Sequence, residues 1–360
     1  MRMVAGKLAR MVAAIVIVSF LTFVLSKALP GDPSLIVLGT QANAFVPCAS
    51  GPHDTTSGAA DCSGVPKDRI VQEGAVGPPP TLSKCTAAEC ITERDQFRHI
   101  HHLDEPVLKQ YFLWAGGALH GDFGTTFEAS PQPVAHELSQ AMPVTIQFVL
   151  LAEVLSLILA VPIGVFAAYR ENRLGDKVAT GASFVALAIP NFVLAIFMVT
   201  LLVVNLKWLP LLYTSWSQDP VKNIQSLVIP VIALSAGTIA VFVRLLRSDM
   251  IATLQEDFIL MARAKGMPPM RILFRHALRP SSFSLLTVAG INLGALIGGT
   301  VIVENMFQAN GLGLLLVTSI YTRDYPVIQA VVLIVSAVFV AVNVLVDILY
   351  SLLDPRIRHA

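Results

Sequence analysis

Charged residues are scarce in this chain, in which Asp, Glu, Lys and Arg together make up only 14% of the 360 residues. An average soluble domain contains about 25%. Hydrophobic residues make up 54% of the chain, and its mean hydropathy is +0.68. So few charges cannot cover the surface of a water-soluble domain of this length. The composition therefore excludes that class and indicates that lipid is part of the solvent.

Two sequence motifs of enzymes are also absent. The chain contains no GxxxxGK[ST] phosphate loop, so it cannot hydrolyse ATP by that route. It contains no HExxH zinc motif, and nothing in it indicates the buried Ser–His pair of a membrane protease. We therefore expect no catalytic residue, metal site, cofactor or nucleic-acid partner. The formal net charge of +1 does not indicate a partner, because it averages over the compartments that the chain crosses.

Long apolar runs are what the chain has instead. A helix needs about 20 apolar residues to cross a bilayer, and six runs are candidates, of which the third and fourth have the least distinct ends. We therefore expect an all-α polytopic membrane protein with six transmembrane helices. The first run follows a basic segment, as a signal peptide would, but it is too long and lacks an A-x-A-like cleavage site, so we expect it to be retained. The runs are Leu8–Leu29, Pro143–Ala168, Val178–Leu206, Leu227–Leu246, Ser282–Val303 and Pro326–Leu353.

The positions of the basic residues predict the orientation. If the N-terminus is cytoplasmic, 15 of the 25 Lys and Arg residues fall in the inner segments, which are shorter in total than the outer ones. Since cytoplasmic loops are enriched in Lys and Arg, we expect both termini inside. Residues 1–29 then form the first helix with its cytoplasmic N-terminus, and residues 30–142 form an extracytoplasmic insert. Residues 143–360 form a core of five transmembrane helices with a cytoplasmic loop at 247–281.

All four cysteines lie in the insert. On the oxidising side of a membrane, four cysteines indicate two disulfides. Of the three possible connectivities we favour Cys48–Cys62 with Cys85–Cys90, and free or metal-bound thiols are the alternative. The run Arg98–Glu105, RHIHHLDE, contains three histidines. Without a matching cysteine or carboxylate geometry, a solvated helix end explains it better than a metal site.

The cytoplasmic loop has the densest positive charge in the chain. Five of the residues 260–280 are Lys or Arg, and no Asp or Glu lies between Asp257 and Glu304. A solvated basic face is the simplest explanation, since anionic headgroups attract each cation by about 1 kcal/mol.

The loop also has the pattern of a rigid helical elbow. Residues 257–265 favour a helix, and Gly266 stands where a left-handed residue would end it. Met267 precedes proline and is expected to be extended. One of the two prolines that follow can open a second helix over about Met270–Leu278, which would enter the membrane at Pro280. Such an elbow could transmit force from a soluble partner to the spans on either side.

The stretch ARAKGMPPMRILFRHALRP, residues 262–280, resembles the cytoplasmic coupling loop of permease subunits from bacterial ABC importers, in particular the dipeptide and oligopeptide branch. Leu260 stands where that branch usually has Arg, and Pro280 where it usually has Asn, which puts the contact with the ATPase in doubt. Four further stretches are similar to signatures of the branch, so the resemblance covers nearly the whole chain apart from about residues 40–95. They are ALPGDP at 28–33, WAGGALHGDFG at 114–124, RDYP at 323–326 and DILYSLLDPRIR at 347–358.

The resemblance implies a type I ABC importer permease fold in the bacterial inner membrane. It implies a permease of an ATP-driven importer of di- and oligopeptides, with a second homologous permease, two ATPase subunits that bind ATP and Mg, and an extracytoplasmic binding protein. Nickel complexes or sugars are alternative substrates, and a proton-coupled secondary transporter is the alternative class. The residues expected to contact the ATPase are Ala262, Arg263, Ala264, Lys265, Gly266, Met267 and Arg271.

Three residues within the apolar runs are candidates for the translocation pathway. Glu153 lies near the middle of the second run, where a charged carboxylate costs a few kcal/mol. It could line the pathway or form a hydrogen-bonded link inside the bundle. Asn292 is more typical of an interhelical hydrogen bond. Pro190 is expected to kink the third span, either to open backbone carbonyls toward the pathway or for structural reasons alone.

Overall fold

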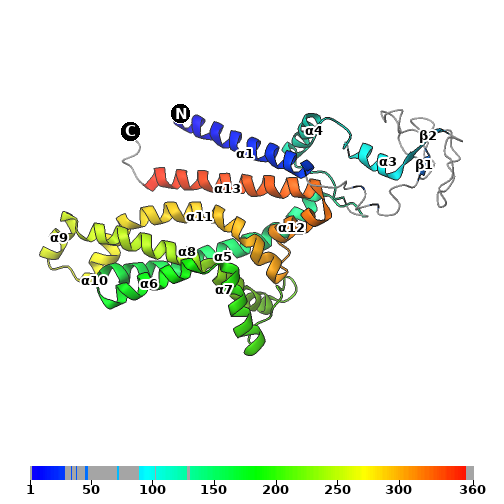
Figure 1. Cartoon of the computed structure of the whole chain (residues 1–360). Coiled ribbons are helices and arrows are strands. Elements are labelled where there is room, and N and C mark those ends of the chain that lie inside the picture. Colours follow the sequence, from blue (N-terminus) through cyan, green and yellow to red (C-terminus); the bar gives the residue numbers. More distant parts are fainter. Residues whose placement is uncertain are drawn as a thin grey trace. The chain divides into compact units, whose positions relative to one another are not determined.

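The computed structural model of the chain is mostly helical (Figure 1). It describes residues 2–28, 45–47, 71–72, 89–101, 103–127 and 130–353, together with Ser34 and Leu38. The α-helices are α1 (Arg2–Ala28), α3 (Glu93–Ile100), α4 (Val107–Leu119), α5 (Val134–Tyr169), α6 (Leu174–Ala188), α7 (Asn191–Met198), α8 (Pro220–Leu254), α9 (Asp257–Ala264), α10 (Pro269–Arg271), α11 (Leu278–Phe307), α12 (Leu312–Thr322) and α13 (Tyr325–Leu353). Two π-helices, η2 (Val199–Asn205) and η3 (Ile272–Ala277), and three strands, β1 (Phe45–Pro47), β2 (Val71–Gln72) and β3 (Glu89–Thr92), complete the elements.

The described helices account for most of the predicted spans. Four continuous helices are long and apolar enough to cross a membrane: α5, α8, the α10–η3–α11 run and α13. The pair formed by α6 and the α7–η2 helix makes a fifth if it is counted as one broken span. The described apolar part of α1, Met11–Lys27, is shorter than the others. The predicted count of six therefore depends on including α1, whereas the multi-span helical class is confirmed.

The chain divides into two compact units. The first unit consists of residues 1–15, 138–317 and 333–360, and the second of residues 16–137 and 318–332.

In the first unit, α8 runs along α6 and α11 and also contacts α7 (Figure 1). Its first turn is capped by Asp219, whose Oδ1 accepts the backbone N–H groups of Val221 at 3.0 Å and Lys222 at 3.1 Å. These N–H groups, that of Lys222 first, hold the pKa of the exposed Asp219 carboxyl below its usual value. Fifteen side chains of α8 are buried, so this helix forms the centre of the unit.

Two apolar clusters form the core of the first unit. One contains Phe242, Leu246 and Met250 of α8 together with residues of α9 and η3. The other contains Phe148 of α5, Leu234 of α8 and Phe307 of α11. Each burial removes a large side chain from water or lipid and contributes packing energy through many close contacts.

Small residues let α13 approach α11 closely. A Cβ on Gly290 would overlap the side chain of Val346, and one on Gly294 would overlap the ring of Phe339. The two glycines are four residues apart and therefore share one face of α11. This is the small-xxx-small packing by which membrane helices associate.

In the second unit, β3 lies between β1 and β2 in a small antiparallel sheet, with Cys90 opposite both Pro47 and Val71. Cys48, Cys62 and Cys85 lie outside the described residues, so the disulfides remain a prediction. The His101 ring packs against Phe97 in a tilted arrangement and against Phe127 edge to face, with centroid distances of 4.4 and 4.6 Å.

Candidate functional site

The predicted elbow begins with α9 and turns at Gly266. The N–H of Gly266 donates to the carbonyl of Arg263 at 2.9 Å, and the N–H of Met267 donates to that of Ala262 at 3.3 Å. These two bonds form a Schellman motif, which requires a left-handed residue after the helix. Gly266 has φ +72°, so the prediction of a glycine stop is confirmed.

The second arm of the elbow is continuous with a membrane span. Pro268 is extended at φ −66° and ψ 144°, and Pro269 opens α10. The helix then passes through η3 into α11 without ending at Pro280. The second helix predicted at about Met270–Leu278, which was expected to enter the membrane at Pro280, is the first part of a single 39-residue run, Pro269–Phe307. Its π-helical turn lies just before Pro280, which cannot donate the backbone hydrogen bond of a regular α-helix.

The inner side of the elbow is packed against the helix bundle. Ile259 and Ala262 of α9 are 0% and 5% exposed, and they belong to the same cluster as Met250, Ile272 and Leu273. Met267 is half-buried against that cluster. The elbow is thus held by apolar contacts on both of its arms, and a force on α9 reaches α8 and α11 through packed side chains.

The outer side of the elbow exposes an unusual combination of residues. Five large apolar side chains are 46–64% exposed here, and all five Lys and Arg residues of 260–280 are exposed. An apolar surface edged by cations suits a protein partner better than water alone. We call the apolar set the elbow face; it consists of Phe258, Leu260, Met261, Met270 and Phe274.

The residues predicted to contact an ATPase divide between these two sides. Ala262 is buried and Met267 is half-buried, so both belong to the packing of the elbow. The five others, Arg263, Ala264, Lys265, Gly266 and Arg271, are exposed. The elbow face was missed from the sequence, although residues 258–262 are apolar on every side of the helix. A helix that is apolar all round must meet a second apolar surface.

Two of the predicted pathway residues are hydrogen-bonded to each other inside the bundle. Glu153 of α5 is 5% exposed, and its Oε2 accepts from Asn292 Nδ2 of α11 at 2.9 Å. The same amide donates to Thr238 Oγ1 of α8 at 3.3 Å. The second oxygen of Glu153, Oε1, is buried without a hydrogen-bond partner among the described residues. The carboxyl therefore faces helices of its own chain.

Pro190 marks a break in the third span. The helix α6 ends at Ala188, Pro190 precedes α7, and the two helix axes differ by 97°. The expected kink inside one helix is thus a full break. Asn191 Oδ1 lies 3.8 Å from where a Cβ on Gly237 would stand, so the break contacts the middle of α8 next to Thr238.

A buried carboxylate that the sequence did not reveal holds the start of α12. Glu304 is 0% exposed, and its Oε2 accepts the N–H groups of Gly313 at 2.6 Å and Leu314 at 3.2 Å. Its Oε1 accepts from Thr145 Oγ1 at 2.7 Å, and that hydroxyl accepts the N–H of Leu312 at 2.8 Å. These contacts satisfy backbone donors at a helix N-terminus, where a negative charge is favourable.

An ion pair between the buried Asp176 and the half-buried Arg247 joins α6 to α8. Asp176 accepts two hydrogen bonds from Arg247, one from Nε and one from Nη2, the latter at 2.6 Å. It also accepts the N–H of Asn172 at 2.9 Å, which holds that residue at φ +62°. Arg247 is one of the 15 cations that the sequence analysis assigned to the inner segments, but the ion pair with Asp176 neutralises its charge.

An apolar groove of about 530 Å³ lies between α5 and α8. Gln147 at one end donates to Asn223 Oδ1 at 3.0 Å and accepts from Tyr213 Oη at 3.0 Å. Trp216, which lines the groove, is 57% exposed. No pattern in the sequence distinguishes this face, because Gln147 and Asn223 come from separate helices.

Comparisons with known proteins agree on one family. The family model described as "Binding-protein-dependent transport system inner membrane component" matches residues 160–359. The oligopeptide transport system permease protein AppB of Bacillus subtilis (strain 168) is 36% identical over 298 residues, which cover 81% of this chain and 92% of AppB. A protein of Brucella abortus (strain 2308) described as a peptide transport system permease protein is 32% identical over 99% of both chains. That alignment extends across residues 40–95.

A solved structure of the MetNI methionine ABC transporter in an inward-facing conformation has a similar fold. Its TM-score is 0.51 at 16% sequence identity, over 61% of this chain and 96% of that one. At this identity the likeness concerns the fold alone.

Proposed function

This chain belongs to the family of binding-protein-dependent transport system inner membrane components, and on that basis we propose that it is a permease subunit of an ATP-driven importer of di- and oligopeptides. It is a multi-pass membrane protein. Two relatives whose names specify peptides or oligopeptides support this substrate class over nickel complexes and sugars. No feature of the described residues favours a proton-coupled secondary transporter.

The proposal includes a set of partners. A second homologous permease completes the pathway, and an extracytoplasmic binding protein delivers the peptide. Two ATPase subunits bind ATP and Mg²⁺ and provide the energy, because this chain has no phosphate loop. The termini and the elbow are cytoplasmic, so the elbow can contact the ATPases.

The elbow face is the observation that carries this proposal. Its side chains are exposed although α9 itself is firmly packed through Ile259 and Ala262. Binding of an ATPase would bury Met261 and its neighbours and place the surrounding cations against the partner. When the ATPase pair closes around ATP, α9 moves with it. Because η3 continues into α11, this movement would shift a whole membrane helix.

We propose the α5–α8 groove, rather than Glu153, as the surface of this chain that contributes to the pathway. The groove is open and is lined by the half-buried Gln147 and the exposed Trp216, whereas the Glu153 carboxyl is hydrogen-bonded to Asn292 inside the bundle. In this arrangement Asn292 does not line the pathway but joins α11 to α5 through its hydrogen bond to Glu153. The break at Pro190 supports this arrangement by seating α7 against the middle of α8.

Copurification of the ATPase with the tagged full complex tests the coupling role. We expect Met261→Glu to reduce ATPase recovery at least about tenfold, since a charge replaces an apolar side chain at the centre of a contact. Gly266→Val should do the same by straining the left-handed turn, whereas Gly266→Asn should retain the ATPase because Asn tolerates that conformation. The Cβ of either residue meets nothing within 4 Å, so this pair isolates the backbone effect.

The matched control is Lys109→Glu, an exposed position on α4. Its ATPase recovery should equal that of the wild type. Equal recovery with Met261→Glu and Gly266→Val, in complexes whose two permeases remain associated, would contradict the coupling role of the elbow.

A further inference from the structure

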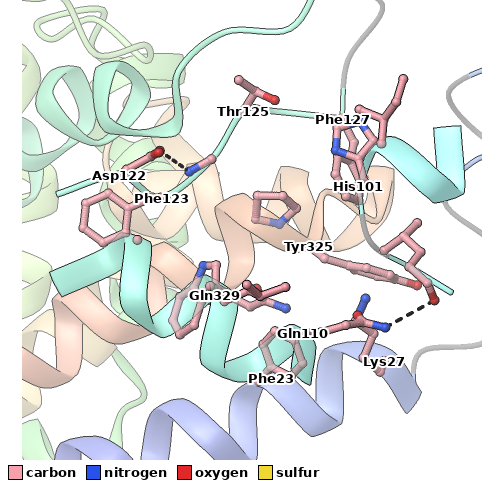
Figure 2. Close-up of a pocket in the computed structure, with 17 residues that line it drawn as sticks. Phe23, Lys27, His101, Gln110, Asp122, Phe123, Thr125, Phe127, Tyr325 and Gln329 are labelled. Carbon is pink, nitrogen blue, oxygen red and sulfur yellow. Dashed lines mark hydrogen bonds between the residues drawn. The ribbon is translucent and has the colours of Figure 1, made fainter. Parts of the chain in front are cut away.

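The second unit contains a cavity of about 510 Å³ at the ends of two membrane helices. Figure 2 shows Phe23 and Lys27 from the end of α1, Gln110 from α4, and Tyr325 and Gln329 from the start of α13 around it. Gln329 Nε2 donates to Ser26 Oγ at 3.0 Å, so the two helix ends are joined beside the cavity. Because α1 and α13 are predicted to cross the membrane, we expect the cavity at one of its boundaries.

A cation without a carboxylate partner points to the ligand. Lys27 Nζ lies 5.7 Å from the ring centroid of Phe23 and 5.2 Å from that of Tyr325. No carboxylate of the described residues forms an ion pair with it. The one acidic residue that lines the cavity, Asp122, is exposed and accepts the N–H of Gly124 at 2.9 Å. The aromatic rings hold the amine in place but do not neutralise its charge.

A second unpaired donor belongs to Trp114, a residue that lines the same cavity. Trp114 Nε1 is buried and has no hydrogen-bond partner among the described residues. The Trp114 ring packs against Phe23, the ring that also contacts Lys27, at a centroid distance of 6.1 Å. An indole N–H can only donate, so a buried one that remains unpaired is costly. An anionic acceptor would satisfy both the charge of the lysine and the unpaired indole N–H.

The surroundings of the cavity identify the source of that anion as lipid. The helix α4, which carries Gln110 and Trp114, has 13 residues and is too short to cross a bilayer. Along one face it exposes Leu108, Phe112 and Leu119, which are 60%, 67% and 86% exposed. A short helix with such a face lies in the membrane interface, where Trp and Tyr are also enriched. The headgroup of a neighbouring phospholipid can reach the cavity there.

We propose that this cavity binds the headgroup of an anionic phospholipid, with a phosphate oxygen accepting hydrogen bonds from Lys27 Nζ and Trp114 Nε1. The apolar walls formed by Phe23, Leu113 and Tyr325 would accommodate the upper part of the lipid. A bound lipid would then bridge α1, α4 and α13. None of the residues that line this cavity belongs to the α5–α8 groove or to the elbow.

Lipid retention by the detergent-purified full complex tests the site. We expect one anionic phospholipid per chain to survive delipidation in the wild type, by mass spectrometry of extracted lipid. Lys27→Met should lower its retention about fivefold, which corresponds to the attraction of one cation for an anionic headgroup. Trp114→Phe should lower it about tenfold by removing a hydrogen bond to a charged acceptor. Lys27→Arg should retain the lipid, and so should Lys109→Met, whose lysine on α4 pairs with Glu105.

A fluorescence titration separates lipid from free phosphate. The chain has three tryptophans, so Trp208→Phe with Trp216→Phe leaves Trp114 as its only one, and the same complex with Trp114→Phe gives the background emission of the other subunits. We expect the Trp114 emission to respond to short-chain phosphatidylglycerol and not to inorganic phosphate, and to lose that response with Lys27→Met. A response to inorganic phosphate alone would overturn the lipid assignment. Equal lipid retention by Lys27→Met, Trp114→Phe and Lys109→Met would overturn the site itself.

Discussion

At the scale of single residues, the polar side chains inside the spans act mainly as links between helices. Glu153 stands out in the sequence because a carboxylate in an apolar run is rare. The sequence could not show which way it points. In the folded chain it lies against Asn292, while the half-buried Gln147, a residue without any special sequence signal, lines the α5–α8 groove instead.

The role of Glu153 can be decided by two substitutions. We expect Glu153→Gln to leave peptide uptake by proteoliposomes and the Tm of the complex close to wild type, because a glutamine can still accept from Asn292. Glu153→Leu removes the acceptor and should lower stability by about 0.6 kcal/mol and at most about 1.7 kcal/mol, the range for such bonds in membrane proteins. Reduced uptake by Glu153→Gln at unchanged Tm would instead indicate a direct role in the pathway.

At the scale of elements, a turn could be predicted from the sequence where the residues that cause it are adjacent in the chain. The left-handed Gly266 follows from a helix, a glycine and two prolines that are adjacent in the chain. The start of α12 could not be predicted from neighbouring residues. Its backbone donors are satisfied by Glu304 and by Thr145, and the latter comes from α5, more than 150 residues away.

The packing around Glu304 predicts that Gly313 cannot be replaced by alanine without cost, whereas Gly298 can. A Cβ on Gly313 would stand 2.5 Å from the Cα of Val301 and 2.8 Å from Glu304 Oε2, so the backbone would have to shift. We expect Gly313→Ala to destabilise the complex by about 1–3 kcal/mol, as overpacking does. The matched control is Gly298→Ala on α11, where a Cβ meets nothing within 4 Å. It should leave the Tm unchanged or raise it, because alanine favours a helix. Equal Tm values for both variants in thermal unfolding would contradict the described packing around Glu304.

At the scale of the whole molecule, the distribution of charge predicts the direction of insertion. The elbow carries exposed cations and no carboxylate from residue 258 to residue 303, which favours the cytoplasmic side. The pair between Asp176 and Arg247 removes one cation from the inner total without reversing the bias. The proposed contact with the ATPases depends on this orientation.

Labelling with a membrane-impermeant maleimide measures the orientation directly. We expect Lys265→Cys to add label in inside-out vesicles from which the ATPase subunits have been stripped, and none in right-side-out vesicles, relative to the four native cysteines. Lys109→Cys should give the opposite result. Label added to Lys265→Cys from the outside would contradict both the orientation and the coupling role.

The sequence by itself determined the membrane class, the apolar runs, the stop at Gly266 and the family resemblance, because these depend on composition and on residues adjacent in the chain. Only the tertiary structure decided what the isolated polar groups do. It placed Glu153 against Asn292, Glu304 at the start of α12, and Lys27 beside the ring of Tyr325. Each of these pairings joins residues from different helices. Their meeting depends on how the helices pack, which no short stretch of the chain encodes.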